Sequence, residues 1–212
     1  MKLIKRSLYV AVLLLAVTAS VALAATITGT NGNDRLVGTN SADTINALAG
    51  NDLVWGRFGN DTINAGDGTD VIYGDGSCSG NPSSANYCEA SPNETNQDGA
   101  DTLYGDKGSD LLFGQGGNDK INGGDGIDVI SGGGGDDTID GGNDSDPISG
   151  GAGADTITGG AAPDAISGDA GNDTIIVKGD KSRDAVSCGA GEDTVSADSS
   201  DAIARDCEHV TH

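Results

Sequence analysis

The 212-residue chain has few basic, aromatic and histidine residues. It contains 11 Lys and Arg against 33 Asp and Glu, its formal net charge is −22, and aromatic residues make up 3% of it. Such a polyanion does not bind nucleic acid or anionic membranes unaided, so its expected partners are cations. The two histidines, His209 and His212, stand at the C-terminal end. Since neither belongs to an H-E-x-x-H motif and no nucleophile elbow with a following histidine occurs, we expect a protein that is not an enzyme.

Long apolar stretches are confined to the start of the chain. A basic segment in residues 2–6 precedes an apolar run from Leu8 to Val17, and an Ala-Leu-Ala cleavage site ends at Ala24. The pattern predicts a signal peptide over residues 1–24 rather than an uncleaved membrane anchor, and therefore a secreted, extracellular protein. Removing the three positive charges of this peptide takes the net charge from −22 to −25. We expect no membrane span in the mature chain.

Cysteine is also scarce. The four cysteines are Cys78, Cys88, Cys188 and Cys207. An exported chain meets an oxidising compartment, so the even count predicts two disulfides. Three pairings are possible, and we prefer the local pairs Cys78–Cys88 and Cys188–Cys207. None of the four has the C-x-x-C spacing of a zinc or redox site.

Glycine and aspartate are abundant, and they follow a period of nine residues. The sixth position of the repeat is always Asp, and the eighth is always a branched aliphatic, from Leu36 to Ile175. Positions one and four are mostly glycine. Low aromatic content and high charge are typical of disorder, but apolar residues placed this regularly exclude it. The sixth-position residues in the two blocks of repeats are Asp34, Asp43, Asp52, Asp61, Asp70, then Asp101, Asp110, Asp119, Asp128, Asp137, Asp146, Asp155, Asp164 and Asp173.

This period predicts an all-β fold, a parallel β-roll (β-solenoid). Three residues centred on position eight form a short strand with the aliphatic side chain inward, and the Gly-Asp segment forms a turn that needs unusual backbone angles. Two repeats make one 18-residue turn with a strand on each side. Turns stacked at about 4.8 Å then give two parallel sheets that face a thin core. The glycine content and the lack of a 3.6-residue period exclude helix.

Stacking also accounts for the aspartates. Residues 18 apart lie one above the other, so pairs such as Asp101 and Asp119 hold two carboxylates about one strand spacing apart, beside exposed carbonyls. Oxygen ligands of this kind suit Ca²⁺. Ten such pairs with one ion each would bring about +20 charges, close to the −25 of the mature chain. A solenoid without metal would leave these carboxylates unneutralised.

Repeats such as GGDGIDVIS, GGGGDDTID and GGAGADTIT resemble the RTX (haemolysin-type) nonapeptide, Gly-Gly-x-Gly-x-Asp-x-aliphatic-x. The resemblance covers residues 29–73 and 96–176. It implies a secreted β-roll with several calcium ions between consecutive turns, held by Asp carboxylates and by carbonyls of the glycine-rich turns. The implied ligands are Asp34, Asp43, Asp52, Asp61, Asp70, Asp101, Asp110, Asp119, Asp128, Asp137, Asp155 and Asp173, with carbonyls of turns such as Gly105, Gly114, Gly123, Gly132 and Gly150.

Two repeats and one segment depart from the pattern. Asp144 and Ala162 replace the position-four glycine, and Pro147 and Pro163, which lack the N–H of a strand ladder, enter the neighbouring repeats. We expect weaker sites, or none, around Asp146 and Asp164. Residues 74–95 are an insertion rich in Ser, Asn and Pro, which we interpret as a tolerated surface loop in preference to a functional one.

After Ile176 the spacing drifts, and residues 188–212 are expected to form a C-terminal cap closed by Cys188–Cys207. The predicted organisation is a signal peptide (1–24), a calcium-binding β-roll (25–187, with the insertion 74–95) and this cap. RTX enzymes and toxins carry a catalytic or pore-forming domain before their repeats, and no such domain is apparent here. RTX exporters usually read a C-terminal signal, so the predicted N-terminal signal is a departure from the family.

Four aromatic residues share position nine of the repeat. Trp55 and Tyr73 are 18 apart and should stack, and Tyr104 and Phe113 hold the same position later. We favour the interpretation that they cover a sheet face over binding of a sugar or a partner protein. Two functions result: a monomeric extracellular protein whose folding is driven by calcium, or a calcium-stabilised adhesive or surface-layer module for a cell-surface glycan or protein. An enzyme acting on polysaccharide would need a basic cleft, for which Lys and Arg are too few.

Overall fold

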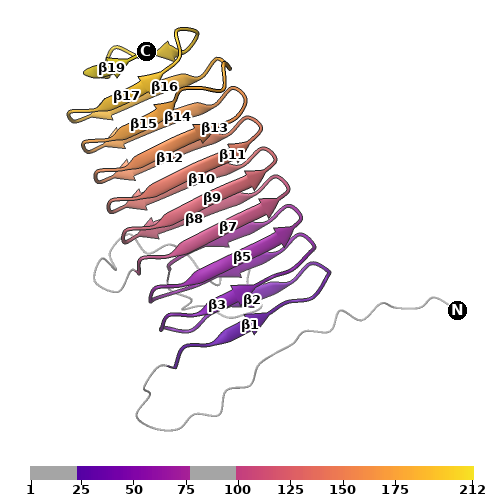
Figure 1. The fold of residues 1–212 in the computed structure, drawn as a ribbon. Coiled ribbons are helices and arrows are strands. Elements are labelled where there is room, and N and C mark those ends of the chain that lie inside the picture. The colour runs from indigo at the N-terminus through magenta and orange to yellow at the C-terminus, as the bar shows by residue number, and fades with distance from the viewer. Residues whose placement is uncertain (1–22, 77–98) are drawn as a thin grey trace, which may run out of the picture.

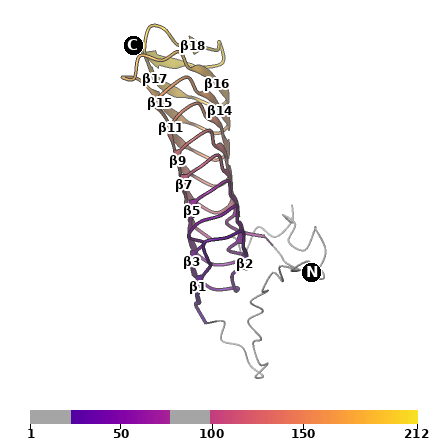
Figure 2. The ribbon, with the colours of Figure 1, turned by 90° about the vertical axis from the view of Figure 1, so that its right-hand side faces the viewer.

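The computed structural model describes residues 23–76 and 99–212, and within these ranges it contains β-strands and no helix. The chain winds back and forth between two parallel sheets, so that strands with odd numbers form one sheet and those with even numbers the other. Figure 1 shows the turns stacked from the N-terminal to the C-terminal end, and Figure 2 shows the two sheets as close, narrow layers. The predicted parallel β-solenoid is confirmed. No helix in the described ranges is long and apolar enough to cross a membrane.

The ten-stranded sheet, here called sheet A, consists of β1 (Thr26–Thr28), β3 (Thr44–Asn46), β5 (Thr62–Asp67), β7 (Thr102–Lys107), β9 (Lys120–Asp125), β11 (Thr138–Asn143), β13 (Thr156–Gly160), β15 (Thr174–Val177), β17 (Thr194–Ala197) and β19 (His209–Thr211). The nine-stranded sheet, sheet B, consists of β2 (Arg35–Val37), β4 (Leu53–Trp55), β6 (Val71–Tyr73), β8 (Leu111–Gly116), β10 (Val129–Gly134), β12 (Pro147–Ala152), β14 (Ala165–Ala170), β16 (Ala185–Ala190) and β18 (Ala202–Ile203).

Strand register follows the repeat. Partners are 18 residues apart within each block, as in Ile130 with Ile148. Across the insertion the partners are 40 apart, as in Ile63 with Leu103, so 22 added residues leave the register unchanged. The predicted loop 74–95 lies mostly outside the described residues, but Gly74 still belongs to the solenoid, where its N–H donates to the carbonyl of Phe113.

The core is a double row of the position-eight aliphatics, one from each strand. Each is at most 3% exposed between Ile45 and Ile175, and each packs against its neighbours one turn away. Side chains on either side of it point outward, as the alternation of a strand requires. Burying one such side chain contributes roughly 2 kcal/mol. The aliphatic period therefore explains the thin, continuous core that was expected.

The strands are longer than predicted. Many span six residues, as β7 and β10 do, instead of three. The strand continues through positions one to three of the next repeat, although position two there has a positive φ, as at Asp106 (69°) and Gln115 (80°). The turn is correspondingly shorter, and its position-four residue also has a positive φ, as at Gly108 and Gly126.

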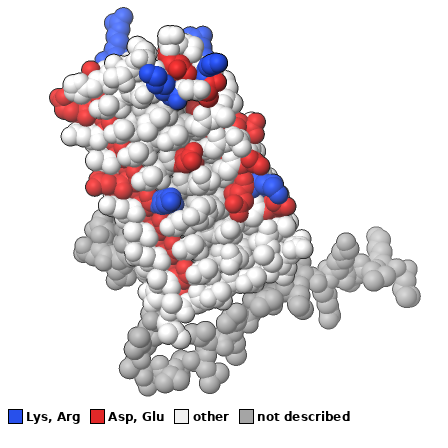
Figure 3. Space-filling view, viewed as in Figure 1, with Lys and Arg blue, Asp and Glu red and all other residues white. Residues whose placement is uncertain are grey.

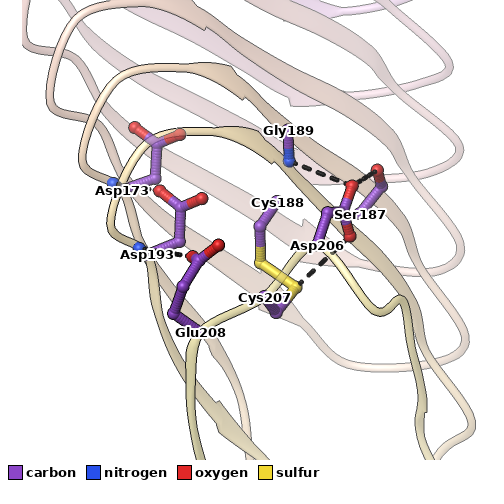
Figure 4. The surroundings of a disulfide bond; sticks show 8 residues. All are labelled: Asp173, Ser187, Cys188, Gly189, Asp193, Asp206, Cys207 and Glu208. Atoms are coloured by element: carbon purple, nitrogen blue, oxygen red, sulfur yellow. Dashed lines mark hydrogen bonds between the residues drawn. A yellow bond between two sulfur atoms is a disulfide. The ribbon is translucent and has the colours of Figure 1, made fainter.

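The C-terminal residues continue the same two sheets. Partners are 20 apart across the loop before Asp184, which absorbs two extra residues, as in Ile166 with Val186. In the last two pairs of strands they are 17 and 15 apart, as in Ala185 with Ala202 and Thr194 with His209. Strand β16 runs across the predicted boundary between roll and cap at residues 187 and 188. The disulfide Cys188–Cys207 is present, with Cα atoms 5.1 Å apart, and ties β16 to the last turn (Figure 4). The other preferred pair, Cys78–Cys88, lies outside the described residues.

The aromatic strip is shorter than expected. Trp55, Tyr73 and Phe113 stack on sheet B with ring centroids 5.9 and 5.1 Å apart, and the Arg35 guanidinium lies 4.6 Å from the Trp55 ring centroid. Tyr104 is on sheet A instead, between Asn64 and Asn122, because successive repeats alternate between the sheets. Trp55 is only 3% exposed, which supports the interpretation that these rings cover the sheet face.

Candidate metal centre

The sixth-position aspartates form two columns, each at one lateral edge of the solenoid, where the chain turns into a strand. The first column leads into sheet B and the second into sheet A. From Asp43 to Asp193 these side chains are at most 4% exposed. Figure 3 shows acidic side chains at the lateral edges and a sheet face that is mostly uncharged. The first column is Asp34, Asp52, Asp70, Asp110, Asp128, Asp146, Asp164 and Asp184, and the second is Asp43, Asp61, Asp101, Asp119, Asp137, Asp155, Asp173 and Asp193.

All the predicted aspartate ligands therefore lie in these columns. Asp146 and Asp164, expected to form weak sites, have the same place as the others. Asp184 and Asp193 also belong to the columns, although the drift in spacing kept them from the predicted set. The sequence does contain a pattern that could have identified them, since Asp184-Ala-Val and Asp193-Thr-Val repeat the Asp-x-aliphatic motif.

One oxygen of each carboxylate binds the backbone. The N–H of each column aspartate donates to Oδ1 of the aspartate one turn later, as from Asp110 to Asp128 (2.8 Å) and from Asp119 to Asp137 (2.8 Å). The same bond is 2.7–2.9 Å long at every step from Asp34 to Asp184 and from Asp43 to Asp193. This ladder fixes each carboxylate inside its turn.

Beyond the first turn, the second oxygen, Oδ2, makes no hydrogen bond to a described residue in most of these aspartates. It is buried and has no hydrogen-bond partner among the described residues in Asp52, Asp61, Asp70, Asp110, Asp128, Asp137, Asp146, Asp155, Asp164, Asp173 and Asp193. A buried acceptor without a partner costs about 1–3 kcal/mol, and more when it is charged. A row of such oxygens is the arrangement that a bound cation would satisfy.

The first turn differs. Thr30 donates its N–H (2.5 Å) and its hydroxyl (2.9 Å) to Oδ2 of Asp34. In the same way, the N–H of Thr39 donates to Oδ2 of Asp43, and the Thr39 hydroxyl donates to Oδ1 (3.1 Å). Both carboxylates are thus satisfied by the protein itself.

In most turns the free Oδ2 faces a glycine at position one. A β-carbon on Gly150 would lie 2.5 Å from Oδ2 of Asp155 and 2.8 Å from the carbonyl oxygen of Gly168 on the next turn. We call this space, bounded by a carboxylate oxygen and a carbonyl oxygen, the cradle of that aspartate. Position one has no positive φ, so glycine is needed there for space and not for backbone freedom. The same two kinds of oxygen lie within 3.0 Å at Gly56, Gly74, Gly105, Gly114, Gly123, Gly132, Gly141 and Gly168, and also at Gly29 and Gly38, where threonines already bind the carboxylate.

The predicted carbonyl ligands fit this geometry in most cases. The carbonyl oxygens of Gly114, Gly123, Gly132 and Gly150 each face the cradle of the preceding turn. The carbonyl of Gly105 does not face a glycine of the preceding turn, because the strand register places Gly105 opposite Ala65, which has a side chain.

The buried carboxylates resist ionisation in this arrangement. Burial, with a smaller contribution from neighbouring carboxylates, raises the pKa of Asp61, Asp110 and Asp137 to about 7, although the backbone N–H bond to the carboxylate opposes the rise. A divalent cation in the cradle would remove this penalty by supplying the opposite charge. The columns are therefore electrostatically incomplete without a cation.

The donors are oxygen atoms only, which suits a hard cation such as Ca²⁺. In residues 23–76 and 99–212, no group of three or more His, Cys, Asp or Glu side chains is placed to hold a metal ion. An ion in a cradle would therefore need backbone carbonyls as well as carboxylates, and the cradles present both.

Comparison with known proteins agrees with this chemistry. The RTX calcium-binding nonapeptide repeat matches the chain at residues 28–63, 48–77, 96–130, 113–147, 140–175 and 149–182. A search of curated proteins finds no match. The matched segments span most of the described solenoid and contain the column aspartates from Asp34 to Asp173. The chain belongs to the family of proteins with RTX calcium-binding nonapeptide repeats.

Proposed function

We propose that this protein is a secreted, monomeric calcium-binding β-roll without catalytic activity, and that calcium ions bound in the cradles drive its folding. The observation that carries the proposal is the row of buried Oδ2 atoms without partners, most of which lie beside a carbonyl of the next turn. Family membership supports calcium as the ion. The signal-peptide pattern of residues 1–24 supports export, and the disulfide Cys188–Cys207 fits an oxidising compartment.

The residues that would hold calcium are the column aspartates, through Oδ2, and the position-one carbonyls. When bound, calcium supplies positive charge that offsets the repulsion within each column. The aspartates orient Oδ2 toward the cradle through the Oδ1 ladder, and the position-one glycines leave the space open. Because the columns form only when turns stack, the binding free energy adds to the free energy of folding.

Calcium titration tests this proposal. The purified protein, freed of metal with a chelator, is titrated with Ca²⁺ while far-UV circular dichroism and calorimetry are followed. We expect a cooperative transition from coil to β-structure with several ions bound per chain. Full β-structure in chelator, together with no heat of binding, would contradict the proposal. Mg²⁺ is the control, since its strict octahedral geometry and tightly held water fit these cradles poorly.

Export is tested separately. The mass of the protein recovered from the medium of a bacterial host should correspond to a chain that starts at Ala25. A cell-bound protein that retains residues 1–24 would indicate a membrane anchor instead.

A further inference from the structure

Position one is not glycine in every turn. Ala47, Ala65, Val177, Cys188 and Ala197 hold this place, and all are at most 4% exposed. They belong to the same hydrophobic core as the position-eight aliphatics. At these turns the apolar core therefore extends to the edge of the solenoid. In the other turns the same place holds a cradle with a carboxylate oxygen and a carbonyl oxygen.

These side chains stand beside particular aspartates. Ala65 precedes Asp70 by five residues, the same separation as Gly105 from Asp110. The Ala65 methyl group thus occupies the cradle that Oδ2 of Asp70 faces, and Ala47 does the same at Asp52. Cys188, held in the disulfide, occupies the corresponding place at Asp193.

One cradle is closed from the next turn. A β-carbon on Gly159 would lie 2.6 Å from Oδ2 of Asp164, but its other nearest atoms are Cδ1 of Ile166 (3.2 Å) and Cγ1 of Val177 (3.3 Å). Methyl groups have replaced the carbonyl oxygen there. The preceding cradle, at Gly141, keeps both Oδ2 of Asp146 and the carbonyl of Gly159.

We propose that apolar side chains at position one, and in the first turn two threonines, decide which column aspartates bind calcium, so that a metal-binding middle is flanked by two ends that fold without metal. This inference rests on the proposed function. Closed positions are those of Asp34 and Asp43, satisfied by threonines, of Asp52, Asp70 and Asp193, which have an apolar side chain at position one of their own repeat, of Asp164, which faces Val177 of the next turn, and of Asp184, which accepts the Ser182 hydroxyl. Open positions are those of Asp61, Asp101, Asp110, Asp119, Asp128, Asp137, Asp146, Asp155 and Asp173.

Protein groups complete the column at each of its two ends. At the C-terminal end the ladder finishes on Asp201, which accepts the N–H of Asp184 (3.2 Å), and on Glu208, which accepts the N–H of Asp193 (3.0 Å) (Figure 4). The disulfide joins Cys188 of β16 to Cys207, the residue before Glu208. At the N-terminal end Thr30 and Thr39 have a different role, because they donate to the Oδ2 atoms of Asp34 and Asp43.

Counting ions in single-residue variants tests the inference. Native mass spectrometry of the calcium-loaded protein gives the number of ions per chain. We expect Ala65→Gly, which opens the cradle of Asp70, to bind one ion more than the unmodified protein. Gly132→Ala, which fills the cradle of Asp137, should bind one ion fewer. Gly134→Ala is the matched control in the same turn, because a β-carbon there meets only the carbonyl oxygen of Gln115, at 3.9 Å.

A closed position gives a second measurement. Asp70→Asn should leave the ion count unchanged, since Ala65 already excludes an ion from that turn. Unchanged counts in both Ala65→Gly and Gly132→Ala would overturn the inference while leaving calcium binding intact. If Gly132→Ala does not fold, the gain or absence of one ion in Ala65→Gly decides the matter alone. An unmodified protein that binds no calcium at all would instead overturn the proposed function.

Discussion

At the scale of the residue, the two oxygens of each column aspartate have separate tasks. In Asp137, Oδ1 accepts the N–H of Asp119 and Oδ2 faces the cradle at Gly132. The hydrogen-bond ladder therefore depends on Oδ1, and the proposed ion site depends on Oδ2 of the same side chain. An asparagine can keep the hydrogen bond of the ladder, but it cannot supply the charged oxygen of the ion site.

Asp137→Asn separates these tasks. Asparagine keeps an acceptor for the Asp119 N–H but places an NH₂ group, or a neutral oxygen, at the cradle. We expect one fewer ion per chain and a rise of about tenfold in the calcium concentration at the folding midpoint, equivalent to roughly 1.4 kcal/mol. Circular dichroism during calcium titration measures the midpoint. Asp140→Asn, at an exposed position of β11, is the control, and an equal shift in both variants would contradict the assignment.

The sequence could not reveal which glycine in a run of glycines has which structural role. In the segment Gly132–Gly135, Gly132 provides space for a cradle, Gly133 and Gly135 have φ of 116° and 125°, and Gly134 has neither constraint. The repeat identifies the aspartates and aliphatics because their chemistry is distinctive at one position. It treats the four glycines alike, so the pattern alone does not show that Ala47 and Ala65 stand at the position that faces a column aspartate.

At the scale of the element, each strand contributes one buried aliphatic side chain to the core. In β11 this residue is Ile139, which is 1% exposed and lies between Ile121 and Ile157 of the flanking strands. The nine-residue period predicted this placement, because a strand alternates its side chains and only one position of the repeat is always aliphatic.

Ile139→Ala should lower the free energy of unfolding by about 3 kcal/mol, through lost burial and the cavity left behind. Urea denaturation in saturating calcium measures this quantity. Thr138→Ala, an exposed position of the same strand, should change it by less than about 0.5 kcal/mol. Similar losses in both variants would indicate that β11 is not packed on the core in the way described.

The last strands depend on a covalent tie. Strands β18 and β19 are short, and the disulfide joins β16 to the turn between them. Removing it in the double variant Cys188→Ala, Cys207→Ala should cost about 2–4 kcal/mol. Hydrogen exchange should then become faster at His209 and Ala204, whose N–H groups donate to the carbonyls of Asp193 and Val186, while Ile139 in β11 remains protected. Equal loss of protection in all strands would show that the end of the solenoid does not unfold independently.

At the scale of the whole molecule, the columns couple folding to the charge on many carboxylates at once. Burial and, to a lesser extent, neighbouring carboxylates raise the pKa of Asp61, Asp110, Asp137 and Asp146 from 3.8 to about 7 in the metal-free fold. Between pH of about 4 and 7 the folded chain therefore binds more protons than the unfolded chain. Since stability falls with pH wherever the folded state holds more protons, the metal-free fold loses stability through this window.

Protons and calcium should consequently replace one another. Protein freed of metal on a chelating resin should show more β-structure at pH 5 than at pH 8, because protonation removes the repulsion that calcium otherwise neutralises. With calcium present the order reverses, since protons compete for the carboxylates and the calcium midpoint rises on acidification. Circular dichroism at both pH values, with and without calcium, measures the four states. Metal-free protein that gains β-structure between pH 5 and pH 8 would contradict the raised pKa values, and with them the view that the columns need a positive charge to fold.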